Sequence, residues 1–167
     1  ARFTLIAAMN PCPCGFYGEH DTECRCAAYD IIRYQKKISG PLLDRIDLQL
    51  KVDRVHIEDL RNDSSQHQPE SALVRERVKN ARLIQLQRPL KTGPGVNSEM
   101  SSREIETHVD LDSSGEGFLA SLGKSRLSPR AYYRLMKVAR TIADLENSQK
   151  TTSEHLAEAF SYRLRES

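Results

Sequence analysis

Residues 127–145 read LSPRAYYRLMKVARTIADL, and this stretch decides the fold class. Ser128 is a residue type that caps helix N-termini, and Pro129 suits the first helical position because it has no N–H to leave unpaired. Apolar residues then recur every three or four positions and form one apolar stripe. The stripe consists of Leu135, Val138, Ile142 and Leu145. We predict a helix from residue 129 to about 147 that packs this stripe against other elements.

The residues before this helix predict further helices. Residues 70–88 form one, and Lys91 to Gly95 then breaks the chain. Helices start again at Ser101 or Ser102 and near Ser114. The candidate buried positions of the helix over 70–88 are Leu73, Val74, Val78, Ala81, Ile84 and Leu86.

The last helix and the domain boundary complete this part of the chain. Thr151 is followed three residues later by Glu154, which is a capping-box pattern that starts a helix at Thr151. Residues 62–69 have the polar composition of a linker. We therefore predict one domain over residues 1–61 and a separate, all-helical domain over residues 70–167.

The N-terminal domain is predicted to be a small α/β remnant. Residues 3–9, FTLIAAM, form a nearly continuous apolar run that is typical of a buried strand in a parallel sheet. A cysteine-rich loop follows to residue 26, then a helix over 27–38 and a strand over 46–53. The predicted fold class is mainly α, with two strands and one helix ahead of the helical domain.

Composition limits the classes of protein that this chain can be. Apolar residues make up 38% of its 167 residues and charged residues 29%, which is typical of a folded chain outside a membrane. No apolar run approaches the roughly 20 residues that a membrane span needs, and the first nine residues do not resemble a signal peptide. We expect a cytoplasmic protein with no membrane partner. A net charge of +2 is too small to indicate nucleic acid by itself.

A phosphate-binding loop must be considered because Gly117 to Ser125 resembles one. Five residues separate Gly117 from Gly123, whereas the Walker pattern requires four. The segment also falls between predicted helices rather than after a strand. Gly123 is better explained as the end of a helix. We therefore expect this chain alone to bind ATP weakly or not at all.

Four cysteines lie close together in one loop: Cys12, Cys14, Cys24 and Cys26. Four thiolates can complete a tetrahedral zinc site, and four protein ligands make such a site structural rather than catalytic. Zinc knuckles more often have two residues between paired cysteines, so the alternative of four reduced thiols without a metal stays open. His20 lies in the same loop and is interpreted as a bystander.

Two polar residues of the N-terminal domain are candidate phosphate contacts. Asn10 ends the apolar run, and ligands of open parallel sheets bind at the carboxyl ends of strands. Alternatively, Asn10 is a turn residue before Pro11. Arg45 precedes a predicted strand, where an arginine can reach the γ-phosphate of a neighbouring subunit. Alternatively, Arg45 pairs with Asp44 or Asp47.

Arg130 lies in the first turn of the helix that follows Ser128. A cation there opposes the helix macrodipole, whose N-terminal end is already positive. Because helix N-termini bind anions, Arg130 predicts an anion site, which Arg134 can extend one turn later. Alternatively, Arg130 is a solvated side chain that the helix tolerates.

Together these residues resemble the ComM-like branch of the magnesium-chelatase AAA+ ATPase family. The resemblance covers nearly the whole chain in order, apart from residues 54–69 and 91–99. It is carried by residues 3–15 (FTLIAAMNPCPCG), 39–47 (SGPLLDRID), 127–134 (LSPRAYYR), 137–145 (KVARTIADL) and 155–159 (HLAEA).

The resemblance implies a role for each polar residue. Asn10 would be the sensor-1 residue, Arg45 the arginine finger and Arg130 the sensor-2 arginine, so that all three act in catalysis. Asn10, Arg130 and Arg134 would contact the nucleotide. The two predicted domains would be the last part of an AAA+ core and its helical lid. The resemblance also implies Walker A and B motifs upstream, ATP with Mg²⁺ as cofactor, and a homo-oligomeric, hexameric ring.

The function implied by the resemblance is that of an ATP-driven motor. ComM-like members resemble DNA motors that drive branch migration during recombination of incoming DNA, whereas magnesium-chelatase members help to insert magnesium into a porphyrin. The cysteine-rich insertion favours the ComM-like branch and therefore a DNA partner. A third reading is a zinc-stabilised binding module with no ATPase role. Without Walker motifs, the chain alone would be inactive.

The apolar run of residues 3–9 leads to one more expectation. A strand exposes unpaired N–H and C=O groups when its neighbours in the sheet are missing. We therefore expect the chain by itself either to self-associate or to displace this strand.

Overall fold

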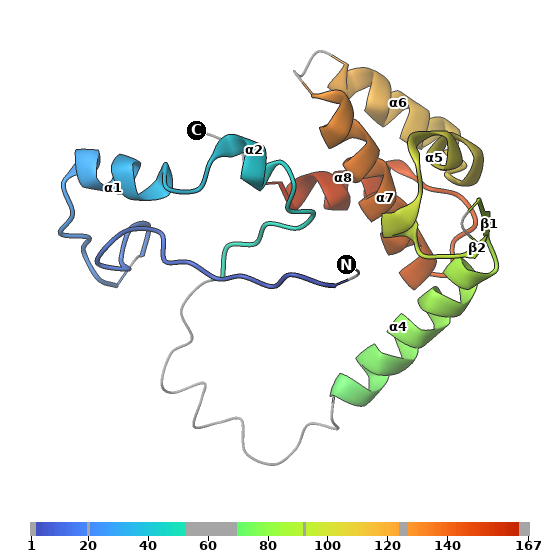
Figure 1. Cartoon of the computed structure of the whole chain (residues 1–167), viewed down its shortest axis with the longest axis horizontal. Helices are drawn as coiled ribbons and strands as arrows, with labels where there is room; N and C mark the ends of the chain where they lie inside the picture. Colours follow the sequence, from blue (N-terminus) through green and yellow to red (C-terminus); the bar gives the residue numbers. More distant parts are fainter. Residues whose placement is uncertain (1–2, 20, 53–69, 92, 124–126, 164–167) are drawn as a thin grey trace. The chain divides into compact units, whose positions relative to one another are not determined.

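The computed structural model describes residues 3–19, 21–52, 70–91, 93–123 and 127–163. They fall into two compact units, residues 1–46 and residues 47–167. The predicted linker over 62–69 lies outside the described residues. Helices dominate the described chain, so the predicted mainly α class is confirmed (Figure 1). Among the described helices, none combines the length and the apolar character that a membrane crossing requires.

The first unit consists of the cysteine-rich loop and two short helices. α1 (Ala28–Gln35) confirms the predicted helix over 27–38 in a shorter form and buries Ile31. α2 (Gly40–Leu43) begins after Ser39 and has Pro41 in its first turn, where a missing N–H costs nothing.

The two strands predicted for the N-terminal part are absent from the described residues. Residues 3–10 and 48–52 form no regular structure, and Phe3, Ile6 and Val52 are 78%, 91% and 83% exposed. A strand takes its backbone hydrogen bonds from neighbouring strands, and no described segment pairs with residues 3–9. The expectation that the chain by itself either self-associates or displaces this strand stays a prediction. Asp53, the end of the second predicted strand, lies outside the described residues.

The second unit is a helical bundle with one small hairpin. Its elements are α4 (Glu70–Leu86), β1 (Pro89–Leu90), β2 (Gly93–Pro94), the 3₁₀ helix η1 (Asn97–Glu99), α5 (Ser102–His108), α6 (Ser113–Leu122), α7 (Pro129–Leu145) and α8 (Ser153–Ser161). The antiparallel hairpin pairs Pro89 with Pro94 and Leu90 with Gly93. It forms at the predicted chain break over 91–95 and turns the chain from α4 towards η1.

α7 forms the centre of the second unit. α4, α5, α8 and η1 all pack against it. Leu135, Met136 and Ala139 of α7 are buried, and they meet Ile105 from α5 and Leu156 from α8. Ser128 Oγ accepts the Ala131 N–H at 3.2 Å, so the predicted cap and start of this helix are confirmed.

The predicted start of α5 is correct, whereas α8 starts later than predicted. Ser101 and Glu104 form the capping box of α5. α8 begins at Ser153, not at Thr151, and its N-cap is Thr152, whose N–H donates to His155 Nδ1 at 2.9 Å. The shift has a cause: the Thr151 backbone is already engaged in a parallel bridge with Leu111.

The buried face predicted for α4 is mostly wrong. Ala81 is buried, but Leu73, Val74 and Val78 are 64%, 53% and 49% exposed. Leu86 is exposed as well, and Ile84 is half-buried. Figure 1 shows why: α4 meets the bundle with its C-terminal half, while its N-terminal half extends away from α7.

The described part of the segment that resembles a Walker motif is helical, as expected if it is not a phosphate-binding loop. Gly117 lies inside α6, and Gly123 is the C-terminal cap of that helix. Lys124 and Ser125 lie outside the described residues.

Candidate functional site

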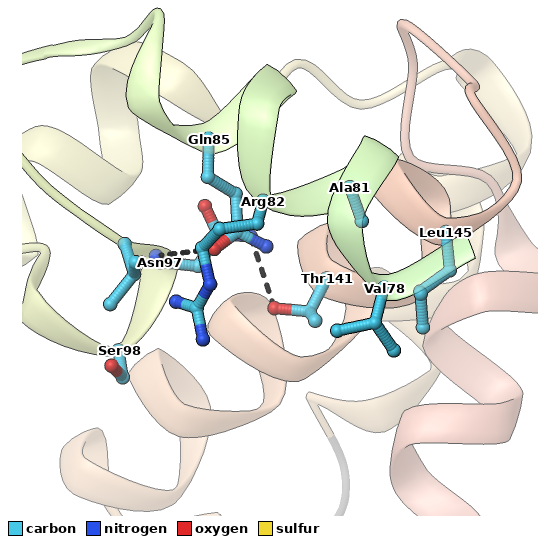
Figure 2. A pocket seen from close by; sticks show the side chains of 9 residues that line it. Val78, Ala81, Arg82, Gln85, Asn97, Ser98, Thr141 and Leu145 are labelled. Carbon is cyan, nitrogen blue, oxygen red and sulfur yellow. Dashed lines mark hydrogen bonds between the residues drawn. The ribbon is translucent and has the colours of Figure 1, made fainter. Parts of the chain in front are cut away.

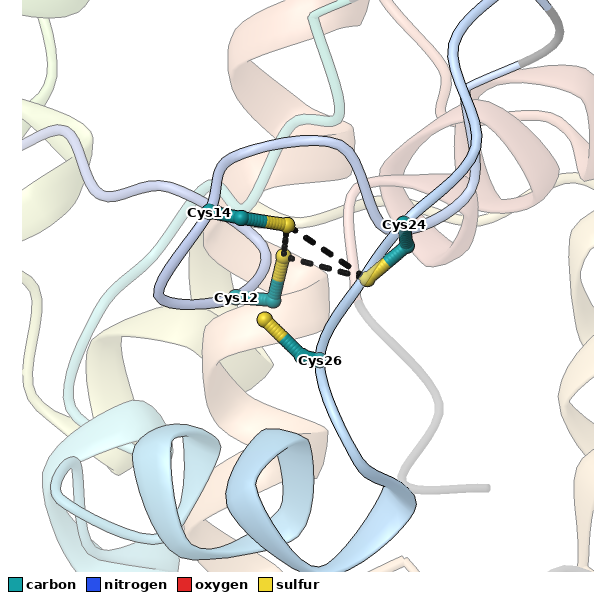
Figure 3. Close-up of side chains that lie close together, drawn as sticks. All are labelled: Cys12, Cys14, Cys24 and Cys26. Atoms are coloured by element: carbon teal, nitrogen blue, oxygen red, sulfur yellow. Dashed lines mark hydrogen bonds between the residues drawn. The ribbon is translucent and has the colours of Figure 1, made fainter.

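The four cysteines predicted as metal ligands lie together in the loop before α1 (Figure 3). Their Sγ atoms all lie within 4.8 Å of one another. The Sγ distances are 3.4 Å for Cys12–Cys14, 3.7 Å for Cys12–Cys24 and 3.6 Å for Cys14–Cys24. All four thiols are free, so no pair forms a disulfide. The cluster can therefore hold a metal ion.

A tight turn brings the first two cysteines to face the second two. The Gly15 N–H donates to Cys12 O at 3.1 Å. Gly15 has φ +86°, a left-handed conformation that glycine adopts without the strain of a side chain. Cys12 is fully buried, and the other three cysteines are half-buried.

Backbone N–H groups point at the sulfur atoms. The N–H of Phe16 and that of Arg25 donate to Cys14, and together they outweigh burial and lower the pKa of this thiol to about 6. These hydrogen bonds favour the Cys14 thiolate, which is the form that binds metals, whereas the neighbouring thiols and burial raise the pKa of Cys26 to about 12. His20, interpreted as a bystander, lies outside the described residues.

Asn10 lies at the start of the same turn. A Cβ atom placed on Gly15 would be 3.8 Å from Asn10 Nδ2, so the Asn10 amide rests beside this glycine. Gln35, the last residue of α1, donates from Nε2 to Pro11 O at 3.1 Å. The turn that carries Asn10 thus contacts both the cysteine cluster and α1. The role of Asn10 as a phosphate sensor stays a prediction.

Arg45 follows α2 and folds back onto it. Its Nη1 donates to Pro41 O, one helical turn earlier. Asp47, one of the two carboxylates considered as a partner for Arg45, pairs with Arg134. The side chain of Arg45 is exposed, and its role as an arginine finger stays a prediction.

The two arginines predicted on α7 have different surroundings. Arg130 is exposed at the second helical position, next to the Ser128 cap. Arg134 Nε pairs with Asp47 Oδ1 at 3.1 Å, and its side chain is only 13% exposed. Arg130 is therefore the one that is open to an added anion, while Arg134 is held by a carboxylate.

The structure brings together some of the predicted site residues. The four cysteines meet, and Asn10 lies beside them in the first unit, which also contains Arg45. Arg130 and Arg134 lie one turn apart in the second unit. Convergence of Asn10, Arg45 and Arg130 on one phosphate stays a prediction.

Sequence reasoning missed a buried polar network at the C-terminal end of α7. Asp144 is 1% exposed and accepts from Arg140 Nε at 3.1 Å and from Arg88 Nη1 at 2.7 Å. Asn97 of η1 donates to Asp144 Oδ2 at 2.8 Å. Arg140 also donates to the chain that leads to α8, at Ser148 O, Gln149 O and Thr151 Oγ1. Burial lowers the pKa of Arg140, although Asp144 opposes this shift.

One signal could have revealed this network. Arg140 and Asp144 are four residues apart and lie on the same side of α7 as the apolar stripe, where a charged residue needs a partner. The partners Asn97 and Arg88 could not be read from sequence, because they lie more than forty residues away along the chain.

A pocket of about 260 Å³ lies between α4, η1 and α7 (Figure 2). Gln85 Oε1 accepts the Asn97 N–H at 3.4 Å, and Asn97 Nδ2 donates to Thr141 Oγ1 at 3.0 Å. Val78 and Leu145 supply an apolar wall. Among the described residues, no buried side-chain polar atom lacks a hydrogen-bond partner. The polar groups of the pocket therefore serve the bundle itself.

Comparison with known families covers both units. Residues 68–163 match the family described as magnesium chelatase, subunit ChlI C-terminal. Residues 1–60 match the family described as magnesium chelatase, subunit ChlI.

Comparison with curated proteins gives relatives that match nearly the whole of this chain. The chain is 44% identical over 165 residues to the competence protein ComM of Haemophilus influenzae, which covers 98% of this chain and 31% of that protein. It is 42% identical over 168 residues to the uncharacterised protein YifB of Escherichia coli, with the same two shares. An uncharacterised protein of Mycobacterium tuberculosis is 35% identical over 164 residues, which are 98% of this chain and 32% of that protein. The chain thus spans about a third of the length of these relatives.

Proposed function

This chain belongs to the magnesium-chelatase ChlI family of AAA+ proteins and is of the ComM type, and from this premise we propose that it is the sensor and lid portion of a ring-forming ATPase. The intact protein would be an ATP-driven motor that moves DNA branches. The observation that carries the proposal is the match of residues 1–60 and 68–163, in order, to the two parts of one family.

The position of Arg130 supports the proposal independently. Its guanidinium is exposed at the N-terminal end of α7, a helix anchored in the core by Leu135 and Ala139. A cation at this helix end is unfavourable by a few tenths to about 1 kcal/mol unless an anion is present. A phosphate would remove that cost and would use the N–H groups of the helix end as well.

Each proposed residue would act on the γ-phosphate in a different way. Asn10 would orient the attacking water, and Arg130 would bind the γ-phosphate from the same subunit. Arg45 would reach it from the neighbouring subunit. ATP with Mg²⁺ would be held mainly by the Walker motifs expected elsewhere in the intact protein. Hydrolysis would then change the angle between core and lid, and this motion would do mechanical work.

The test is ATP hydrolysis by the intact protein with Arg45→Ala or Arg130→Ala. Removing an arginine that stabilises the transferring phosphoryl group lowers the rate by roughly a thousandfold or more. Arg103→Ala is the matched control, because Arg103 is exposed at the same second position of α5. Normal hydrolysis by both Arg45→Ala and Arg130→Ala would exclude an ATPase role for this site.

A second measurement separates the DNA motor from a chelatase motor. If the proposal is correct, branched DNA stimulates ATP hydrolysis by the intact protein, and the assembled ring unwinds or moves the branch. If hydrolysis responds only to porphyrin and the partner subunits of a chelatase, the DNA role is wrong while the ATPase role stands. Mass measurement of the ATP-bound assembly tests the proposed homo-hexamer.

The cysteine cluster would have a separate cofactor. We propose a structural Zn²⁺ there, because four sulfur ligands and no open position are typical of structural zinc sites. If the chain binds zinc but the intact protein hydrolyses no ATP, the alternative of a zinc-stabilised binding module is correct.

A further inference from the structure

The spacing of the four sulfur atoms fits one ion. Zn–S bonds of about 2.3 Å at tetrahedral angles place sulfur atoms about 3.8 Å apart. The distances among Cys12, Cys14 and Cys24 are 3.4 to 3.7 Å, and Cys26 lies within 4.8 Å of all three. Free thiols gain little from such proximity, because S–H groups are weak hydrogen-bond donors.

Backbone N–H groups surround the cluster in the manner of a metal cradle. Cys12 is hydrogen-bonded to the backbone of Gly15 and Tyr17. Cys14 is bonded in the same way to Phe16 and Arg25, Cys24 to Cys26, and Cys26 to Cys14. Hydrogen-bond donors around a ligand atom orient it towards its metal.

Apolar burial cannot hold this loop in place. Within the described part of the first unit, only Cys12 and Ile31 are buried apolar side chains. A loop without its own core keeps one conformation only if another constraint replaces the missing burial, and a structural metal is such a constraint.

The constrained turn is the one that carries Asn10. Asn10 is two residues before Cys12, and its amide rests beside Gly15, the residue after Cys14. The Pro11 carbonyl between them accepts from Gln35 of α1. Asn10 is therefore fixed on one side by the cysteine cluster and on the other by α1.

We propose that Cys12, Cys14, Cys24 and Cys26 bind one Zn²⁺, and that this ion positions Asn10 by holding its turn against α1. The second half of this inference rests on the proposed role of Asn10 in orienting the attacking water. The cysteines are positioning residues in this scheme, since none of them would touch the nucleotide.

The first experiment measures the metal alone. The purified chain is expected to contain one zinc per molecule, and replacement by Co²⁺ should give the intense absorption of tetrahedral thiolate ligation. Cys24→Ser should lose the bound metal, whereas Cys24→His should keep it, because imidazole is a zinc ligand. Glu23→Gln is the control: Glu23 is exposed in the same loop and should be neutral. A reduced chain that takes up neither zinc nor cobalt would overturn the site.

The second experiment tests positioning in the intact protein, with a cycle of Cys24→Ser and Asn10→Ala. A misplacement of about 1 Å can lower a rate a hundredfold, so Cys24→Ser should lower kcat by up to that factor and change KM for ATP little. Cys24→His should restore kcat. In the Asn10→Ala background, Cys24→Ser should cause almost no further loss.

The outcomes of this cycle are distinct. Losses that multiply in the double variant would show that zinc acts independently of Asn10, and the positioning role would be wrong. A normal kcat for Asn10→Ala would refute the sensor role itself, while the metal measurements would still decide the zinc site. Circular dichroism identifies any variant that fails to fold. If Cys24→Ser fails to fold, the kcat of Cys24→His, which should keep the metal, is compared with that of the unmodified protein, and a low kcat in a metal-loaded Cys24→His would contradict the positioning role.

Discussion

Arg140 and Asp144 show how a single pair of charges can organise a small domain. Each is 1% exposed, and both are surrounded by partners, so the charges are buried without being left unsatisfied. Asp144 binds Arg88, two residues after α4, and Asn97 in η1, while Arg140 binds the chain leading to α8. The pair therefore fixes three connections at one point.

Neutralising Asp144 should destabilise the second unit strongly. Asp144→Asn keeps the shape but leaves Arg140 buried without its counter-charge, and breaking such a pair costs about 3 to 5 kcal/mol. The free energy of unfolding in urea measures the loss. Glu116→Gln, at an exposed position of α6, should change it by less than about 0.5 kcal/mol. Equal losses in the two variants would contradict the account.

Glu104 should make stability depend on acid pH. Hydrogen bonds from the Ser101 hydroxyl and from the Lys91 and Ser101 N–H groups lower the pKa of Glu104 from 4.5 to about 2. A carboxyl with a depressed pKa in the folded state adds stability that is complete above pH 4.5 and is lost as pH falls towards 2. Glu104→Gln should therefore lower the melting temperature at pH 7. At pH 2 the difference in melting temperature between the variant and the unmodified chain should be smaller. A constant gap between the two pH values would show that the carboxylate charge is not what matters.

At the level of elements, helices were predictable where the signal is local. The cap Ser128, the following Pro129 and the spacing of Leu135 and Ile142 indicated α7 almost to the residue. Predictions failed where residues far away along the sequence determine where a helix begins or which face it buries. Thr151 has a good capping sequence but is engaged by Leu111, so α8 starts later.

α6 gives a matched pair of glycines for testing this packing. A Cβ on Gly115 would lie 2.7 Å from the main-chain oxygen of Thr151, whereas a Cβ on Gly117 would have nothing within 4 Å. Gly115→Ala should lower the free energy of unfolding by about 1 to 3 kcal/mol through overpacking. Gly117→Ala should raise it by up to about 1 kcal/mol, because alanine is the better helix former. Chemical unfolding of both variants checks the signs, and a stabilising Gly115→Ala would refute the close contact of α6 with Thr151.

At the scale of the whole molecule, the sequence predicted the mainly helical class, but the two strands predicted for the N-terminal part are absent from the described residues. Residues 3–9 have the composition of a buried strand and remain exposed, because composition does not state whether a neighbouring strand is present. The cysteine cluster was predictable, since its four thiols are close in sequence. The proposed roles of Asn10, Arg45 and Arg130 would involve a nucleotide and a neighbouring subunit, and no local sequence pattern encodes such contacts.

The uneven distribution of the core predicts that the two units unfold independently. Nearly all buried apolar side chains belong to the second unit, around Leu135, Ile105 and Leu156. Residues 70–163 alone should therefore unfold cooperatively, at nearly the same temperature as the corresponding transition of the whole chain. Removing residues 47–52 breaks the Asp47–Arg134 ion pair and the hydrogen bond from Gln49 N–H to Tyr162 O. Each contact is worth only about 1 kcal/mol.

A zinc chelator should then act on one unit only. Hydrogen exchange in the whole chain should accelerate in the cysteine loop and α1, whose conformation the metal would hold, and should stay unchanged in α7. The melting temperature of the excised 70–163 segment should not respond to the chelator at all, which makes this segment the control. Faster exchange in α7 after metal removal would mean that the two units are coupled in stability, and a segment that melts without a cooperative transition would mean that the helical bundle depends on the first unit.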